Sequence, residues 1–349
     1  MSAAGPSSPH ATSRCSAPPP LPTIPVIDIG AGGPLELVRR AHLQAEALME
    51  AAWHQFTGPL VLAADWRGRR WLARAGNPHL SEIDAIAHEL GRPGAHGLNL
   101  SYEWVCTSGV AADAGGNTVL RRTLDWPFHG LGRNMVVARR ESGVGPWLDV
   151  TWPGFVGVFT AVAPGRFAAA INQAPLRRRT GLMAADWLID RLKVGRSTDL
   201  PPCHLLREVF ETCRDYAEAQ NLLTTAPICL PALFILAGVR PGEGCIIERT
   251  EEAAAIVDAP AAIANGWLTP AFGRGWARGY DSPTRQCLLA ACQAGPCDDL
   301  EWLQPPIINP YTRLAAVLDA ATGSLTLQGW ERSSPATQTL RLPSPSPSP

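Results

Sequence analysis

The sequence lacks both a long apolar run and an excess of charge of one sign. Its 349 residues carry 30 Lys or Arg against 31 Asp or Glu, so the net charge is −1. A nearly neutral chain has no electrostatic basis for binding nucleic acid or an anionic membrane surface. No stretch approaches the roughly 20 apolar residues that span a bilayer, and the N-terminus has no apolar signal-peptide core. We therefore expect no nucleic-acid partner, no stable membrane insertion and a cytoplasmic location.

Several familiar motifs are also missing. There is no G-x-S-x-G, H-E-x-x-H, Walker A loop or G-x-G-x-x-G opening a helix, which argues against a serine hydrolase, zinc protease, NTPase or dehydrogenase. The nine cysteines are odd in number and contain no C-x-x-C, so a zinc framework is not expected. In a reducing compartment most thiols should be free and buried. We expect no metal ion.

Composition and periodicity divide the chain into two tails and a folded part. Residues 1–25 are rich in Pro, Ser and Ala, and residues 333–349 end in repeated Ser-Pro. Both tails are predicted to be disordered. Residues 26–105 form a largely helical region, and residues 106–332 form the main domain. Within the helical region, the pattern predicts a helical face over 37–52, strand-like pieces at 60–64 and 70–75, and a helix over 81–90.

Short β-prone runs separated by turn signals dominate the sequence from about residue 99. The runs 106–112 and 118–126 read as a hairpin. Strands, then helices, then strands favour an α+β layered domain over a doubly wound parallel sheet. The further predicted strands are 135–139, 147–152, 155–162, 166–171, 232–237, 244–248, 253–257, 313–318 and 324–327, and the further helices are 184–193, 203–223 and 284–293.

One dense stretch carries residues suited to chemistry. Cys106 begins a predicted strand, and the partner strand returns Arg122 and Asp125, so a hairpin could place the three side chains together. A nearby positive charge lowers the pKa of a thiol. If the Val105–Cys106 bond is cut, the new α-amine has a pKa of about 7.7–8.0 and can act as a general base. Nucleophile and base then belong to one residue, which explains why no histidine is needed.

The chain resembles the acid ceramidase and N-acylethanolamine acid amidase family. The resemblance rests on NLSYEWVCTSGV, RRTLDWPF, GFVGVFTAVAPGRFAAAINQAP, ALFILAGVRPGEGCIIER and DSPTRQCLLA, which lie in family order over roughly residues 95–295. More distantly, the chain is similar to bile-salt (choloylglycine) hydrolases and penicillin acyltransferases. The resemblance implies an αββα four-layer sandwich, the N-terminal-nucleophile (Ntn) hydrolase fold. It also implies a precursor that cuts itself before Cys106 into an α chain, 1–105, and a β chain, 106–349.

The resemblance implies roles for individual residues. Cys106 is the nucleophile, Arg122 holds the thiolate and Asp125 orients the amine. Asn265 donates into the oxyanion hole, a contribution typically worth about 3–4 kcal/mol. Arg285 is the better match for a second active-site arginine, and Arg278 is its competitor.

The sequence departs from the family at two positions. Gln173 stands where the ceramidase branch has an acidic residue, which puts an acidic pH optimum in doubt. Thr123 replaces a usual Asn, which is a smaller change.

Each of these residues could instead have a purely structural role. Cys106 could be a buried structural thiol. Arg122 and Asp125 could form a surface ion pair worth under about 1 kcal/mol. Asn265 could simply end a strand. Arg285 could be a solvated helix residue. Aromatic side chains near the site could fill the core or line an apolar pocket for an acyl group. The candidate pocket residues are Trp126, Trp152, Asn172, Gln173 and Trp267.

Three functional hypotheses follow. The first is a self-processing amidohydrolase that cleaves a linear, non-peptide amide of a small N-acyl compound through a thioester, without any cofactor. The second is an acyltransferase that passes the acyl group to an amine. The third is a non-catalytic Ntn-like protein that binds an apolar ligand. The spacing of residues does not separate the first two, because they differ only in which molecule accepts the acyl group.

Overall fold

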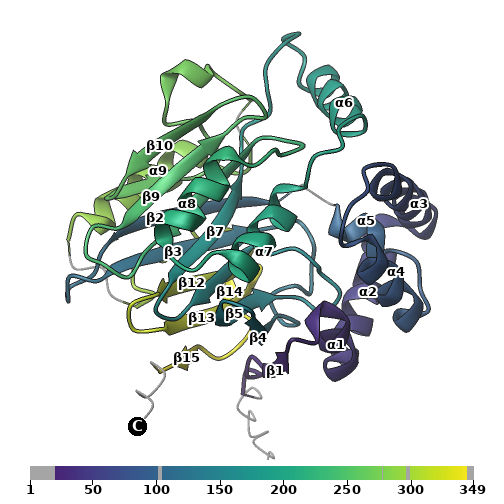
Figure 1. Cartoon of the computed structure of the whole chain (residues 1–349), viewed down its shortest axis with the longest axis horizontal. Helices are drawn as coiled ribbons and strands as arrows, with labels where there is room; N and C mark the ends of the chain where they lie inside the picture. Colours follow the sequence, from purple (N-terminus) through teal and green to yellow (C-terminus); the bar gives the residue numbers. More distant parts are fainter. Residues whose placement is uncertain (1–19, 101–103, 277, 296–298, 344–349) are drawn as a thin grey trace, which may run out of the picture.

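Two β-sheets lie face to face at the centre of the protein (Figure 1). The computed structural model describes residues 20–100, 104–276, 278–295 and 299–343. One sheet has eight strands in the order β1-β4-β5-β6-β7-β8-β9-β10. These are β1 Val26–Gly30, β4 Val136–Ser142, β5 Gly145–Thr151, β6 Thr160–Ala163, β7 Phe167–Gln173, β8 Ala232–Ala237, β9 Gly244–Arg249 and β10 Ala254–Asp258.

The second sheet has seven strands in the order β11-β2-β3-β12-β13-β14, with β15 also pairing with β13. Its central strands β2, β3 and β12 are almost wholly buried because both of their faces are covered. The strands are β2 Val105–Ala112, β3 Thr118–Asp125, β11 Ala261–Ile263, β12 Thr312–Asp319, β13 Ser324–Glu331, β14 Ser334–Pro335 and β15 Leu340–Leu342.

Helices cover the outer face of each sheet. Helices α7 (Pro202–Thr212) and α8 (Tyr216–Thr225) pack on the eight-stranded sheet, and α9 (Ser282–Gln293) packs on β2 and β11. Strand β2 also contacts β7, β8 and β9 across the sandwich. The order of layers is therefore helix, sheet, sheet, helix. The predicted α+β class and αββα sandwich are confirmed.

The N-terminal region is more helical than predicted. Residues 60–64 and 70–75, which we predicted as strand-like, lie almost entirely in α3 (Gly58–Arg74), so that prediction is wrong. Residues 60–64 form a short continuous apolar run, which periodicity alone does not separate from a helix segment, and Leu60 and Leu62 are exposed there. The other helices of this layer are α1 Gly33–Arg40, α2 His42–Phe56, α4 Leu80–Leu90 and α5 Ala95–Asn99. Figure 1 shows them together along one side of the sandwich.

Two predicted helices are each divided. The pattern over 37–52 runs through α1 and α2, which separate at Ala41 because its backbone (φ −119°, ψ 40°) is not helical. The segment 203–223 is divided into α7 and α8. Asp215 begins the second helix, since its side chain accepts the backbone N–H of Glu218. The helix α6 (Met183–Val194) agrees with the prediction to within one residue at each end.

The ends of the folded part also differ from the prediction. Strand β1 adds to the edge of the eight-stranded sheet by pairing in parallel with β4. The chain does not become irregular after residue 332, because Leu340–Leu342 pairs with β13. The predicted disordered tail at 333–349 is therefore wrong for 334–335 and 340–342. Most of the predicted tail at 1–25 lies outside the described residues.

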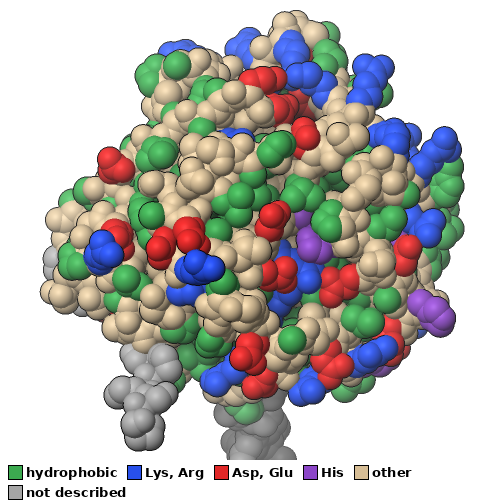
Figure 2. All heavy atoms as spheres, viewed as in Figure 1, with side chains coloured by type: hydrophobic (Ala, Val, Ile, Leu, Met, Phe, Trp, Pro, Cys, Tyr) green, Lys and Arg blue, Asp and Glu red, His purple; other side chains and the backbone are tan. Residues whose placement is uncertain are grey.

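Surface charge, helix hydrophobicity and the state of the cysteines can be compared with the sequence-based expectations. Figure 2 shows acidic and basic side chains interspersed over one face, in keeping with the small net charge. No helix within the described ranges is long and apolar enough to cross a membrane. Six described cysteines are free thiols, and Cys287 is the exposed one. Cys292 is disulfide-bonded. The sequence-based expectation was that most cysteines are free, and it named no disulfide.

A buried polar cluster joins the N-terminal helices to the sandwich. The rings of His79 and His204 contact edge to face, with centroids 4.9 Å apart, and Asn77 Nδ2 lies 3.1 Å from His204 Nδ1. Arg207 of α7 contacts Glu82 of α4 at 2.5 Å. Burial, and then the charge of Arg207, lower the pKa of His79 to about 4.

This cluster should make stability depend on pH. The unfolded state binds a proton at His79 near pH 6.5, whereas the folded state does so only near pH 4. Stability should therefore fall as the pH is lowered from 6.5 to 4. Because the His79 ring is partly exposed, we expect its share to be only about 1–2 kcal/mol. Urea unfolding of wild type and His79→Gln at several pH values measures this. Between pH 6.5 and 4 the free energy of unfolding should fall less steeply in the variant, and equal slopes would contradict the prediction.

Candidate active site

The β2–β3 hairpin places the predicted residues at one end of the second sheet. Val105 pairs with Asp125, Cys106 with Leu124, and Ser108 with Arg122. The predicted hairpin is confirmed, and its register explains why residues 16 and 19 positions after Cys106 return beside it. The expectation that Arg122 and Asp125 form a surface pair is excluded, because both are fully buried.

Cys106 is held by contacts to its sulfur and to its backbone nitrogen. Arg122 Nη2 lies 2.8 Å from Cys106 Sγ, and the sulfur lies 3.8 Å from the carbonyl oxygen of Ile171 on the facing sheet. The backbone N–H of Cys106 donates to Asn265 Oδ1 at 3.0 Å. The sulfur and the nitrogen of this residue are thus each fixed by a separate polar partner.

The Arg122 side chain is itself fixed by the facing sheet. Its Nη1 donates to the carbonyl oxygen of Phe159 at 2.6 Å and to Thr160 Oγ1 at 2.7 Å. These bonds hold the guanidinium so that its other nitrogen points at the sulfur. The geometry suits the stabilisation of a thiolate.

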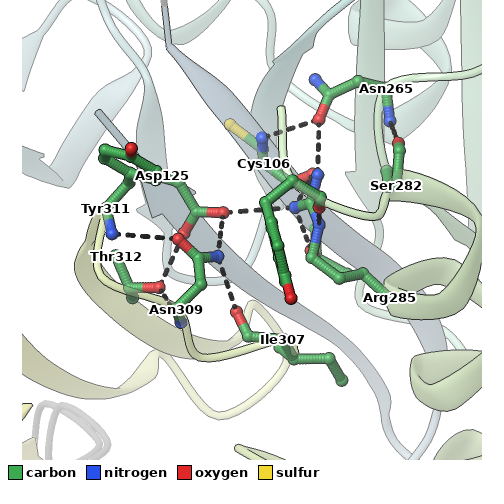
Figure 3. Close-up of polar contacts among 12 residues, drawn as sticks. Cys106, Asp125, Asn265, Ser282, Arg285, Ile307, Asn309, Tyr311 and Thr312 are labelled. Atoms are coloured by element: carbon green, nitrogen blue, oxygen red, sulfur yellow. Dashed lines mark hydrogen bonds and ion pairs between the residues drawn. The ribbon is translucent and has the colours of Figure 1, made fainter. Parts of the chain in front are cut away.

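In the intact chain Asp125 pairs with Arg285, so its predicted role toward the α-amine of a cut chain stays a prediction. Its Oδ2 lies 3.2 Å from Arg285 Nη1 in a fully buried ion pair. Both carboxylate oxygens accept further hydrogen bonds, from Asn309 Nδ2 and Thr312 Oγ1, each at 2.8 Å. Figure 3 shows these side chains converging on Asp125. In the intact chain Asp125 therefore orients Arg285.

Asn309 and Thr312 are functional candidates that sequence reasoning missed. They lie more than 180 positions after Asp125 and reach it because β12 pairs with β3, with Thr312 directly opposite Asp125. The only local signal was a polar Asn-Pro-Tyr-Thr run at the start of a predicted strand. Such a run is more often a turn.

Arg285 belongs to this constellation. Arg285 Nη1 donates to the carbonyl oxygen of Cys106 at 3.0 Å and to Thr107 Oγ1 at 2.7 Å. Its Nη2 lies 3.3 Å from Asn265 Oδ1. Arg278 instead lines a separate small pocket with Gln173. Arg285 is buried, which excludes the alternative of a solvated helix residue.

Asn265 is positioned by both strands and helix. Its Nδ2 donates to the carbonyl oxygen of Gln173 at 2.8 Å, and its backbone N–H donates to Ser282 Oγ, at the start of α9, at 2.9 Å. The amide NH₂ lies on the same side chain whose oxygen accepts from Cys106. A donor group therefore lies next to Cys106, as an oxyanion site there would require.

The titration of Cys106 differs from the prediction. Burial raises the pKa of its thiol to about 11, although Arg122 and Arg285 act in the opposite direction. We had expected a lowered pKa from a positive charge alone. In the intact chain desolvation dominates, so the neutral thiol is favoured. Burial likewise raises the pKa of Asp125, against the effect of Arg285.

The five candidate pocket residues fall into four places, and Gln173 lines the small pocket that it shares with Arg278. Trp126 and Trp152 line a small apolar pocket of about 50 Å³ that α2, α4 and α5 close from the other side. Asn172 is buried, accepts a hydrogen bond from Ser108 Oγ and donates to the carbonyl oxygens of Ile263 and Ala264. Trp267 packs edge to face on Phe272 at 5.1 Å.

The other sites have fewer reactive side chains. A groove of about 700 Å³ lies between α3 and α6, but its lining includes none of the predicted site residues. Within the part of the chain that the structure describes, no group of three or more His, Cys, Asp or Glu side chains could hold a metal ion. The chemistry available at Cys106 is therefore that of a thiol, two arginines, a carboxylate and an amide.

Comparisons with known proteins agree with the motifs. The profile of the family "Linear amide C-N hydrolases, choloylglycine hydrolase family" matches residues 106–266. Acid ceramidase of Pan troglodytes is 29% identical over 213 residues, covering 55% of this chain and 52% of the relative. N-acylethanolamine-hydrolyzing acid amidase of Cavia porcellus is 30% identical over 178 residues, covering 49% and 48%.

A solved Caenorhabditis elegans ortholog of the same amidase has a TM-score of 0.44 and 20% identity, covering 62% of this chain and 93% of that one. The chain spans about half the length of the curated relatives it matches. The resemblance predicted from the motifs is confirmed over this matched part.

Proposed function

We propose that this protein is an amidohydrolase that cleaves a linear, non-peptide amide bond in an N-acyl compound, after cutting itself between Val105 and Cys106. The observation that carries the proposal is the pair of contacts on Cys106. Arg122 holds the sulfur at 2.8 Å, and Asn265 holds the nitrogen at 3.0 Å. One residue therefore presents both a nucleophile and the atom that cleavage would convert into a base.

Cleavage supplies what the intact chain lacks. The Cys106 nitrogen is an amide before the cut and cannot take a proton. Afterwards it is an α-amine with a pKa of about 7.7–8.0, already bonded to Asn265 Oδ1. The cut also separates Val105 from Cys106. Val105 now packs against Gly279 so closely that a Cβ there would lie 2.7 Å from it.

The reaction then proceeds in two steps. The Cys106 thiol gives its proton to its own amine and attacks the substrate carbonyl carbon, and Asn265 Nδ2 stabilises the oxyanion. Collapse of this intermediate breaks the C–N bond, and the ammonium returns the proton to the leaving amine. Water, deprotonated by the same amine, attacks the thioester. The acid leaves, and the thiol is restored.

The apolar pocket supports an acyl group as the part of the substrate that is bound. Trp126, Trp152 and Phe159 line it from the sandwich, and Leu48 and Leu98 line it from the N-terminal helices. Phe159 also supplies the carbonyl that fixes Arg122, which ties the pocket to the nucleophile. Because helices preceding residue 105 form half of the wall, both fragments must remain together for activity.

The test is to follow processing and turnover in one preparation. Mass spectrometry of purified protein should find fragments 1–105 and 106–349, and released amine should appear with a panel of N-acyl amides of increasing chain length. Adding a second amine should leave the free acid as the main product. Acyl transfer to that amine would instead support an acyltransferase. Full activity from an uncut chain would contradict the proposal.

A further inference from the structure

The oxyanion donor Asn265 lies in a short segment, 263–269, that leaves β11 and crosses toward the other sheet. The N-terminal side of this segment is held by Asn172, at the end of β7. Asn172 Nδ2 donates to the carbonyl oxygens of Ile263 at 3.4 Å and Ala264 at 3.1 Å. Carbonyls need a donor, and the amide of Asn172 supplies one.

The C-terminal side of the segment is held by Glu248, in β9. Its carboxylate accepts the backbone N–H of Leu268 at 2.5 Å and of Thr269 at 2.8 Å. Glu248 is fully buried. A carboxylate is an acceptor at both oxygens, so it suits two consecutive N–H groups. Glu248 lies within the quoted motif ALFILAGVRPGEGCIIER, but no role has been given to it above.

The two anchors stand in one row of the eight-stranded sheet. Asn172 pairs with Leu233, and Leu233 pairs with Glu248. Side chains of directly paired residues point to the same face of a sheet. Asn172 and Glu248 therefore both reach across the sandwich to the segment that carries Asn265, one before it and one after it.

We propose that Glu248 is a positioning residue that fixes Asn265 where the oxyanion develops. The proposal rests on the proposed function, because it concerns the donor used there. Asn265 Oδ1 accepts from the Cys106 nitrogen and Nδ2 donates one N–H to the Gln173 carbonyl, which leaves the second N–H for the reacting carbonyl. A shift of the segment moves both atoms together. Glu248 acts through the backbone of Leu268 and Thr269, and it touches neither the substrate nor the thiol.

The test compares Glu248→Gln with wild type on one N-acyl substrate. The glutamine side chain has the same length but presents an NH₂ to one of the two N–H groups, which loosens the segment. We expect kcat to fall roughly 10- to 100-fold with KM changed by less than about twofold, since the donor acts mainly in the transition state. Glu248→Asp, which keeps the charge, should recover part of kcat.

Asp319→Asn is the matched control. Asp319 also accepts two backbone N–H groups, from Ala321 and Thr322, but it ends β12 at the far end from Thr312. Asp319→Asn should have the wild-type kcat once kcat is calculated per folded molecule. Equal losses in the two variants, or a Glu248→Gln enzyme with unchanged kcat, would overturn the positioning role.

Hydrogen–deuterium exchange separates this inference from the proposed function. Leu268 and Thr269 amides should exchange faster in Glu248→Gln than in wild type, and remain unchanged in Asp319→Asn. If exchange is faster in the variant but the protein hydrolyses no N-acyl amide, Glu248 still anchors the segment and the proposed amidase activity is wrong. Unchanged exchange would reject the anchor whether or not the protein is an enzyme.

Discussion

Replacing Cys106 by alanine should leave a single uncut chain and abolish turnover. The change removes only the sulfur that Arg122 contacts at 2.8 Å. Because the proposed function uses the same sulfur for cutting and for attack on the substrate, both should be lost together. Loss of a nucleophile typically costs about 10⁴- to 10⁶-fold in kcat. A denaturing gel and an amine-release assay on the same preparation measure both effects.

Cys287→Ala is the control for this experiment. Cys287 is a free and exposed thiol on α9, the helix that also carries Arg285. This variant should be cut and should turn over like wild type. If Cys106→Ala still released amine at more than about a thousandth of the wild-type rate, the thiol would not be the nucleophile.

The second large effect is expected at Arg285. Replacing it by methionine leaves Asp125 buried without its cation, and the Cys106 carbonyl and Thr107 Oγ1 without their donor. Removing one partner of a buried ion pair costs about 3–5 kcal/mol. Urea unfolding should show this loss. Arg285→Met and the Asp125→Asn variant that completes the cycle should both be made in the Cys106→Ala background, so that every protein compared is uncut.

Asp125→Asn completes a double-mutant cycle. In the double variant neither charge is left unpaired, so the combined cost should be clearly smaller than the sum of the two single costs. Additive losses, within about 0.5 kcal/mol, would mean that the two side chains do not stabilise each other. Activity in the uncut background is not informative here. Stability is the relevant measurement.

The sequence predicted the sandwich well because its strands are short, apolar and separated by clear turn signals. The helices before residue 105 were harder to predict. In α3 the apolar run 60–64 is too short for its period to be read, so that segment resembles a strand. Strand β1 was not predicted, because its partner β4 lies more than 100 positions away. Only tertiary pairing makes such an edge strand stable.

The candidate site was predicted where it is local and missed where it is not. Cys106 and Arg122 come from one hairpin, so spacing alone brought them together. The matching motifs added Asn265 and Arg285. Asn309 and Thr312 reach Asp125 through the pairing of β12 with β3, which no local pattern reveals. The pKa of the Cys106 thiol was predicted in the wrong direction, because burial depends on the whole fold.

The parallel pairing of β1 with β4 has a consequence for how a processed molecule recovers from denaturation. Strand β1 precedes the proposed cut and β4 follows it. Renaturation of the intact chain is a first-order process, whereas two separated fragments must first meet. Recovery of the cut protein should therefore slow on dilution, while that of the Cys106→Ala chain should be independent of concentration.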